Sequence, residues 1–220
     1  EGNADIGLLK CNSDGSVLWA RSWGGEGQDR IAGTTVDTEG RLWLAGTTED
    51  TESGYEDVLL LQFSCDGEML LGKAIGGQLD ESIDAILCTN HRVFLAGSCK
   101  TETSYPYSEG FLLFWEAANG LAVNSGRADL RYSGLDCLVW DNDCNMYVAG
   151  TAMDTLHEWK WDEPEWDIRD LGWTATVLAG TEGVLVGSEG EADGSVTEPT
   201  GVIDTGGGYW DVLVMKNPLM

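Results

Sequence analysis

Apolar strands that begin on an acidic or small residue recur along the chain at a nearly constant interval. They read DIGLLKC from Asp5, DVLLLQFS from Asp57, GFLLFWEA from Gly110 and DVLVMKN from Asp211. Successive starts are separated by 52, 53 and 101 residues, so the last interval is two periods long. A fixed period of this length predicts a repeat architecture, with a degenerate start near residue 161.

Each clear opening strand leads into a turn dipeptide and a second apolar stretch. The dipeptides are Asp14-Gly15, Asp66-Gly67 and Asn119-Gly120. Such pairs favour tight hairpin turns, because both residues tolerate positive φ. Gly24-Gly25 and Gly76-Gly77 then close the first hairpin in each of the first two units. Every clear unit therefore begins with a predicted β-hairpin.

A second predicted hairpin completes each unit. Its copies read DTEGRLWLAGTT from Asp37, CTNHRVFLAGSC from Cys88, DNDCNMYVAGTA from Asp141 and the shorter TEGVLVGSEG from Thr181. A small pair recurs in the last strand as Ala45-Gly46, Ala96-Gly97 and Ala149-Gly150. At these pairs we expect neighbouring sheets to approach closely, because a larger side chain would hold the backbones apart.

Two hairpins per unit predict four-stranded sheets stacked radially, which is an all-β β-propeller. A sandwich and a β-helix are the alternatives, but a solenoid coil is normally shorter than this period and a sandwich rarely repeats so regularly. We expect a single propeller domain over residues 1–220, or part of a larger propeller. Its repeats are expected at 5–56, 57–109, 110–154 and 155–210, with 211–220 as the start of a further unit.

The fourth unit departs from the pattern. Only 26 residues separate its expected start from Gly187, against 40 or 41 in the other units, so its first hairpin is expected to be reduced. The segment HEWKWDEPEWDIRD (157–170) stands in its place. Tryptophans in and beside it are the candidates for contact with a protein or a glycan: Trp159, Trp161, Trp166 and Trp173. Exposed aromatic rings suit both partners, and the same rings could equally fill the space left by the hairpin.

The charge of the chain narrows its partners. Lysine and arginine number 12 against 38 acids, for a net charge of −26. A field of this sign repels nucleic acid and anionic lipid surfaces, so neither is an expected partner. No run of 18 apolar residues occurs, and direct membrane insertion is not expected. The acids suit solubility, a cationic surface or a metal ion.

The six cysteines lack the spacing of a zinc site and leave two interpretations open. One or two disulfides would fit an oxidising compartment. Cys11, Cys88 and Cys137 lie in or beside apolar runs and are equally suited to be small buried hydrophobic residues.

Residues that could carry chemistry are few, and no cofactor is expected. Acids recur at equivalent turn positions, Asp14 with Asp66 and Asp37 with Asp141, which turn chemistry alone explains. His91 and His157 lie near no nucleophile motif and are expected to face solvent. A weak calcium candidate is formed by residues that alternate like the start of an EF-hand loop: Asp141, Asp143 and Asn145. That loop's glycine and glutamate positions hold Met146 and Ala152, so a hairpin turn is the simpler interpretation.

The first unit resembles a known repeat. Residues 5–48 combine an acidic strand start, a turn with glycine, a tryptophan-containing strand ending in Gly-Gly, an Asp shortly afterwards, Val-Asp-x-x-Gly and an Ala-Gly-Thr strand. This pattern resembles the bacterial and archaeal SBBP family, named for seven-bladed β-propeller repeats. The second unit matches well, the third moderately and the fourth only in its second half. The resemblance implies a propeller in a secreted or cell-surface setting, usually as a module of a larger protein, with no catalytic residues.

Two other propeller families are similar only in part. The first hairpin looks like a quinoprotein repeat at Asp14, Gly15 and Trp19, but Leu71 stands where the second unit would need the tryptophan. The residue order of sialidase Asp boxes is not kept either. Pyrroloquinoline quinone is therefore not an expected cofactor.

These features predict a non-catalytic scaffold that mediates protein–protein interaction in an extracellular or lumenal assembly. A lectin-like propeller is the alternative, and a glycoside hydrolase is a third. Other proteins are the expected partners, with the terminal strand at 211–216 as one contact. The longest departures from the repeat, residues 154–173 and 188–208, are expected to form the contact surface.

Overall fold

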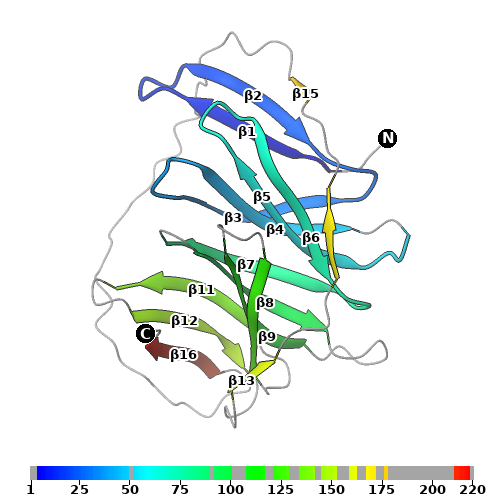
Figure 1. Cartoon of the computed structure of the whole chain (residues 1–220), viewed down its shortest axis with the longest axis vertical. Helices are drawn as coiled ribbons and strands as arrows, with labels where there is room; N and C mark the ends of the chain where they lie inside the picture. Colours follow the sequence, from blue (N-terminus) through cyan, green and yellow to red (C-terminus); the bar gives the residue numbers. More distant parts are fainter. Residues whose placement is uncertain are drawn as a thin grey trace.

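The protein is all-β in every part that the structure describes. The computed structural model describes residues 4–49, 52–89, 92–100, 108–116, 121–128, 134–141, 145–152, 159–162, 167–171, 176–177 and 211–218. These residues form strands β1 to β16 and no helix (Figure 1). The strands are arranged in four sheets, and all their pairings are antiparallel.

The sheets are numbered here in chain order. The first contains β1 (Ile6–Cys11), β2 (Val17–Trp23) and β15 (Thr176–Val177). The second contains β3 (Asp29–Val36), β4 (Leu42–Glu49), β5 (Glu56–Phe63), β6 (Met69–Gly76) and β14 (Asp167–Asp170). The third contains β7 (Glu81–Cys88), β8 (Arg92–Lys100), β9 (Ser108–Glu116), β10 (Leu121–Ala128) and β13 (Trp159–Asp162). The fourth contains β11 (Gly134–Trp140), β12 (Asn145–Ala152) and β16 (Asp211–Pro218).

The two hairpins of one repeat do not form one sheet, and that expectation is wrong. Strand β4 pairs with β5 of the next repeat along its whole length, from Leu42 opposite Phe63 to Glu49 opposite Glu56. Each central sheet therefore combines the second hairpin of one unit with the first hairpin of the next. The chain passes from the first sheet to the second between β2 and β3, at the Gly24-Gly25 pair.

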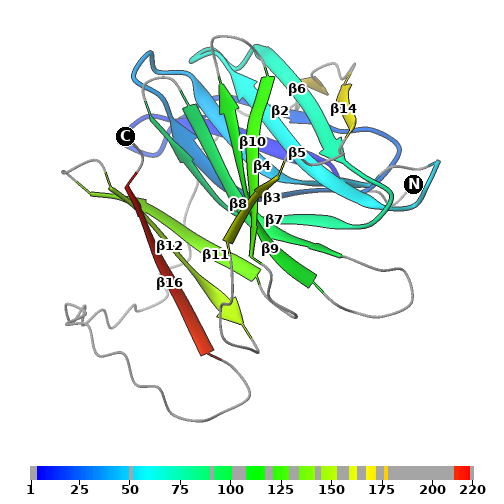
Figure 2. The ribbon, with the colours of Figure 1, turned by 60° about the horizontal axis from the view of Figure 1, so that its bottom comes forward.

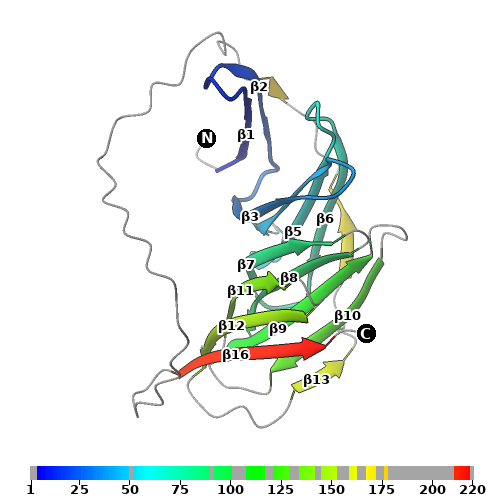
Figure 3. The same cartoon turned by 90° about the vertical axis from the view of Figure 1, so that its left-hand side faces the viewer.

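The four sheets follow one another in a stack (Figure 3). A hydrophobic layer lies between each successive pair of sheets. Strand β5 illustrates the arrangement, because its residues alternate between two layers. Leu59 and Leu61 pack in the cluster shared with the first sheet, and Val58 and Leu60 pack in the cluster shared with the third. All four side chains are fully buried, which explains why the strand reads as a continuous apolar run. Figure 2 shows the fourth sheet as a separate layer, set at an angle to the third.

In each of the three clear repeats, the first strand of the second hairpin contains a β-bulge. The extra residues are Ala32, Asp84 and Asp136, each beside the point where the partner strand carries its Ala-Gly pair. A Cβ atom on any of the three glycines would collide with a backbone carbonyl oxygen of the neighbouring strand. The close approach thus occurs within a sheet and not between sheets, which corrects the expectation for the glycines. The preceding alanines do lie between sheets, since Ala45 and Ala96 are fully buried in the clusters.

The irregular segment adds edge strands to three different sheets. Strand β13 pairs with β10, β14 pairs with β6, and the short β15 pairs with β2. The sequence predicted that this segment takes the place of the reduced hairpin of the fourth unit. Residues 159–162 and 167–170 instead join the edges of the third and second sheets. They cover strand edges whose backbone groups would otherwise lack a partner strand.

The terminal strand β16 pairs with β12, from Asp211 opposite Ala152 to Pro218 opposite Asn145. The register matches that of β5 on β4, where Asp57 lies opposite Thr48. The opening strands at Asp57 and Asp211, which the sequence predicts to be equivalent, therefore pair with their neighbours in the same register. Among the described residues, no strand pairs with the other edge of β16.

Candidate functional site: paired carboxylates at the sheet ends

Two carboxylates meet at the Gly-Gly corner that joins the second sheet to the third. Asp57 and Glu81 are both buried, and a Cβ atom on Gly76 would contact the carboxylate oxygens of both. Glu81 Oε2 accepts a hydrogen bond of 3.2 Å from the Gly77 N–H. Asp57 forms an ion pair with Arg169 of β14. Glycine is required at this corner because it leaves room for the two acids.

The corner between the first and second sheets repeats the arrangement with Asp5 and Asp29. A Cβ atom on Gly24 would contact both carboxylates. The buried Asp29 accepts hydrogen bonds from the Gly25 N–H at 3.1 Å and from the Thr48 hydroxyl at 2.6 Å. The two corners therefore use equivalent acids with equivalent hydrogen bonds from the glycine backbone.

The added edge strands distinguish one corner from the next. Arg169 lies opposite Ala74 on β6, and the equivalent position beside β2 holds Thr176, opposite Ser22. Beside β10 the same position holds Lys160. Cationic residue types thus occupy this register position at the second and third sheets, and a neutral residue occupies it at the first.

The acid at the first corner is electrostatically strained. Burial raises the pKa of Asp29 above its ordinary value of 3.8, and the negative charges of Asp5 and Glu49 raise it further. Hydrogen bonds from Thr48 and Gly25 oppose this rise without cancelling it. A carboxyl group with a raised pKa is a feature of general acids, although structural acids share it.

Replacing Asp29 with asparagine is expected to leave stability at pH 7 unchanged or to raise it by about 1 kcal/mol. An asparagine can still accept from Gly25 through its oxygen and donate to Thr48 Oγ1 through its nitrogen. In the wild type the folded state holds the proton more tightly than the unfolded state, so stability falls as pH rises from 3.8 through the folded pKa and is level above it. The variant is expected to lose this part of the pH dependence in urea unfolding between pH 3 and 8.

Asp29→Ala is the matched control, because it removes the charge together with both hydrogen bonds. It is expected to be less stable than Asp29→Asn by about 1 to 2 kcal/mol. An asparagine variant as unstable as the alanine variant would contradict this account.

Two further acids lie on neighbouring strands at the bulge positions. Asp84 of β7 and Asp136 of β11 are solvent-exposed, yet the surrounding protein raises the pKa of each. Partial burial is the larger cause for Asp84, and the charge of Asp136 adds to it. Among the described residues, this pair and the corner acids are the best candidates for groups that could transfer a proton.

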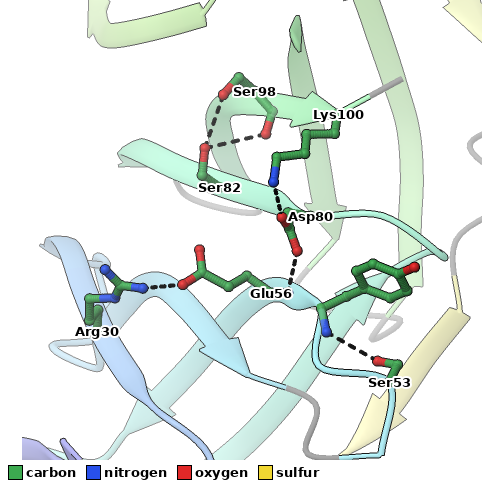
Figure 4. A network of polar contacts seen from close by, with 8 residues as sticks. Arg30, Ser53, Glu56, Asp80, Ser82, Ser98 and Lys100 are labelled. Atoms are coloured by element: carbon green, nitrogen blue, oxygen red, sulfur yellow. Dashed lines mark hydrogen bonds and ion pairs between the residues drawn. The ribbon is translucent and has the colours of Figure 1, made fainter. Parts of the chain in front are cut away.

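A polar network ties the second and third sheets together near the second corner (Figure 4). Asp80 forms an ion pair with Lys100 of β8 and accepts a hydrogen bond of 3.0 Å from the Glu56 N–H. Glu56 forms an ion pair with Arg30 of β3. Burial tends to raise the pKa of Asp80, but the bonds from Lys100 and Glu56 and the Lys100 charge hold it below 3.8.

The repeated turn acids hold the second hairpins closed. Asp37 accepts hydrogen bonds from the Arg41 N–H at 2.9 Å and from Trp43 Nε1 at 3.1 Å. Asp141 accepts in the same way from the Asn145 N–H at 2.8 Å and from the Tyr147 hydroxyl at 2.9 Å.

The second unit has lost both members of this contact. Its turn is one residue shorter, closed by Thr89 N–H donating to the Arg92 oxygen, so Thr89 and not Cys88 corresponds to Asp37. The aromatic partner is Phe94, which has no polar group. The carboxylate and its donor are therefore present together or absent together.

The carboxylate of the weak calcium candidate is used in the hydrogen bonds of this turn. The side-chain amide of Asn145 donates to both carboxylate oxygens of Asp141, at 3.1 and 2.8 Å, and Asp143 lies outside the described residues. Within the described part of the chain, no group of three or more acids, histidines and cysteines is placed to hold a metal ion.

The tryptophan candidates are only partly placed. Trp159 and Trp161 lie in β13, where they pair with Ala128 and Gly126 of β10. Trp166 and Trp173 lie outside the described residues, as do both histidines and the whole of 188–208. The assignment of these tryptophans to partner or glycan contact stays a prediction.

The cysteines correct part of the expectation. Cys11, Cys65 and Cys137 are exposed free thiols, so Cys11 and Cys137 are not buried hydrophobic residues. Cys88 is half-buried against the core, and burial raises its pKa to about 11, with the Asp37 charge adding to the rise. This thiol is protonated at neutral pH and is a poor nucleophile there.

The sequence had not singled out the corner acids or Arg169. The acids were detectable, because Asp29 and Glu81 each follow a Gly-Gly pair by four residues and Asp5 and Asp57 each open a strand. Arg169 was not detectable, since it reaches Asp57 from 112 residues away in sequence.

Comparisons with known proteins assign no family. No protein-family model matches the chain, and no curated protein matches it. The described residues contain no helix that is long and apolar enough to cross a membrane.

Proposed function

We propose that the chain is a non-catalytic β-propeller scaffold that connects other proteins in an extracellular or lumenal assembly. The observation that carries this proposal is the stack of four sheets separated by three hydrophobic layers. Radial stacking of repeated four-stranded sheets is the propeller solution to the edge-strand problem. The resemblance of residues 5–48 to SBBP repeats supports the same fold and the same setting.

The contacts between strands also favour a radial arrangement. Strands β3, β7 and β11 each form the first strand of a sheet, and β7 contacts both of the others. In a propeller, the first strands of successive blades lie side by side around an axis. The contacts of β7 with β3 and β11, two strands related to it by the repeat, support the propeller proposal.

A scaffold is further supported by the use that the repeated acids find inside the fold. Asp29 and Glu81 accept hydrogen bonds from corner glycines, Asp37 and Asp141 hold hairpin turns, and Asp57 pairs with Arg169. These acids recur because the corners and hairpin turns that contain them use them for folding. A surface of net charge −26 suits partners with basic faces.

Capture from native extract tests the proposal. The tagged chain is purified at low salt, cross-linked, and analysed by mass spectrometry; we expect a different protein in stoichiometric amount. The partner should be released as salt rises, because exposed charges are screened over about 8 to 10 Å at 0.1 to 0.15 M salt.

Hydrolysis of glycosides and esters by the purified chain is measured in parallel. A chain that captures no protein, and whose hydrolysis is abolished by Asp84→Asn, Asp136→Asn or Glu81→Gln, would refute the scaffold proposal.

A further inference from the structure

The outer face of the first sheet carries a residue that is buried in every other described copy. Leu9 of β1 is 43% exposed, whereas its repeat equivalents Leu61 of β5 and Leu113 of β9 are 0% exposed. The three residues occupy the same register, opposite Ala20, Gly72 and Ser125. Leu61 and Leu113 pack against the preceding sheet in the stack. Leu9 points in the same direction, where no sheet precedes the first among the described residues.

The outer face of the fourth sheet, at the other end of the stack, also carries an exposed residue whose equivalent is packed in the core. Val139 of β11 is 58% exposed, and its equivalent Leu87 of β7 packs in the cluster shared with the following sheet. Leu87 lies opposite Phe94 and Val139 lies opposite Tyr147, so the two again share one register. Val139 thus faces the side on which a following sheet would stack.

The two outer faces are therefore of the two kinds that meet in the internal layers. Each internal layer joins the face of one sheet that is turned toward its successor to the face of the next sheet that is turned toward its predecessor; Leu87 packs on a face of the first kind, and Leu61 and Leu113 pack on faces of the second kind. We propose that the partner of both faces is a second copy of this chain, whose first sheet stacks on the fourth sheet of its neighbour. This inference names one partner for the proposed scaffold and rests on that function. The contact is heterologous, so it joins copies head to tail in a closed ring or an open chain.

Charge sets the conditions under which this contact forms. Two copies of net charge −26 repel each other, and salt reduces that repulsion by shortening the screening length from about 10 Å at 0.1 M to about 3 Å at 1 M. Apolar contact between the faces does not weaken in the same way. Self-association is therefore expected to strengthen as salt rises, opposite to the release of a basic partner.

Sedimentation velocity of the purified chain tests the inference. The wild-type chain is expected to exceed the mass of one chain as its concentration rises, and to do so at lower concentration in about 0.5 M than in about 0.05 M salt. Leu9→Lys or Val139→Lys is expected to weaken association at least about tenfold, because each buries an unpaired charge at the contact. Leu70→Lys is the matched control: Leu70 is 51% exposed on β6 of the second sheet, which is stacked on both faces, and this change should leave association unaltered.

Mixing the two variants tests the head-to-tail geometry. Leu9→Lys keeps an intact fourth-sheet face and Val139→Lys keeps an intact first-sheet face. Neither is expected to associate alone, whereas an equimolar mixture is expected to form a 1:1 complex. Near-ultraviolet circular dichroism and thermal unfolding check that both variants are folded.

A wild-type chain that stays monomeric at every concentration and salt would overturn the inference. So would a mixture that forms no complex, or a Val139→Lys variant that associates like the wild type through paired first sheets. These results are separable from the scaffold proposal, because they use the purified chain alone and the capture experiment detects a different protein.

Discussion

Replacing Gly97 with alanine is expected to lower the free energy of unfolding by about 3 kcal/mol or more. The new Cβ atom would collide with the Ser82 carbonyl oxygen and crowd the backbone at Ile83. Both belong to the bulged strand β7 of the third sheet, whose two faces pack in two hydrophobic layers. The backbone cannot move away without disturbing the stack. Equilibrium urea unfolding measures the loss.

Gly7→Ala is the control for this substitution. Gly7 also lies in a β-strand, but an added Cβ atom would meet nothing within 4 Å, so a change within about 0.5 kcal/mol is expected. Gly150→Ala should resemble Gly97→Ala, because its Cβ atom would collide with the Gly134 carbonyl oxygen. A Gly97 variant as stable as the Gly7 variant would show that the bulge can relax.

Replacing Asp37 with alanine is expected to destabilise the protein by about 3 kcal/mol. The carboxylate accepts four hydrogen bonds, from Glu39 N–H, Arg41 N–H and Nε, and Trp43 Nε1. The Trp43 side chain is 1% exposed, so its donor would be left buried without a partner. Asp14→Ala is the control, because Asp14 lies in an exposed turn.

The double variant Asp37→Thr with Trp43→Phe copies the natural pair Thr89 and Phe94 of the second unit. Trp43→Phe alone leaves a cavity, and Asp37→Thr alone leaves a buried donor. The double variant removes donor and acceptor together. A double-mutant cycle is therefore expected to give a coupling energy of at least about 1 kcal/mol, and strict additivity would contradict the contact.

The same acid predicts a direction for acid unfolding. Burial alone would raise the pKa of Asp37, but the hydrogen bonds from Trp43 and Arg41 and the Arg41 charge hold it below 3.8. The stability that Asp37 contributes is thus complete above pH 3.8 and is lost as pH falls through the lower folded pKa. Asp37→Asn should flatten the stability profile in that acidic range.

The turn acids and the corner acids of this fold differ in how far a sequence can reveal them. Asp37 and Asp141 were found at the right positions with the right role, because a turn acid acts on residues four to six places away. The corner acids were visible as a spacing, but their burial depends on the stacking of sheets. Arg169 had no local indication, because its edge strand reaches a distant sheet.

The sequence alone determined the all-β class, the period of about 52 residues, the hairpins and their turns, since these follow from alternation and turn chemistry within a few residues. The tertiary structure alone decided how strands are shared between sheets, because each strand edge accepts any strand with a matching register. It showed that the glycines of the Ala-Gly pairs approach the neighbouring strand of their own sheet, where a bulge crowds the backbone, and do not lie against another sheet. It also placed the irregular segment on three sheet edges and left Leu9 and Val139 exposed at opposite ends of the stack. The burial of a strand residue depends on which face of its sheet another sheet covers, and the pattern of residues along the chain does not show where that other sheet lies.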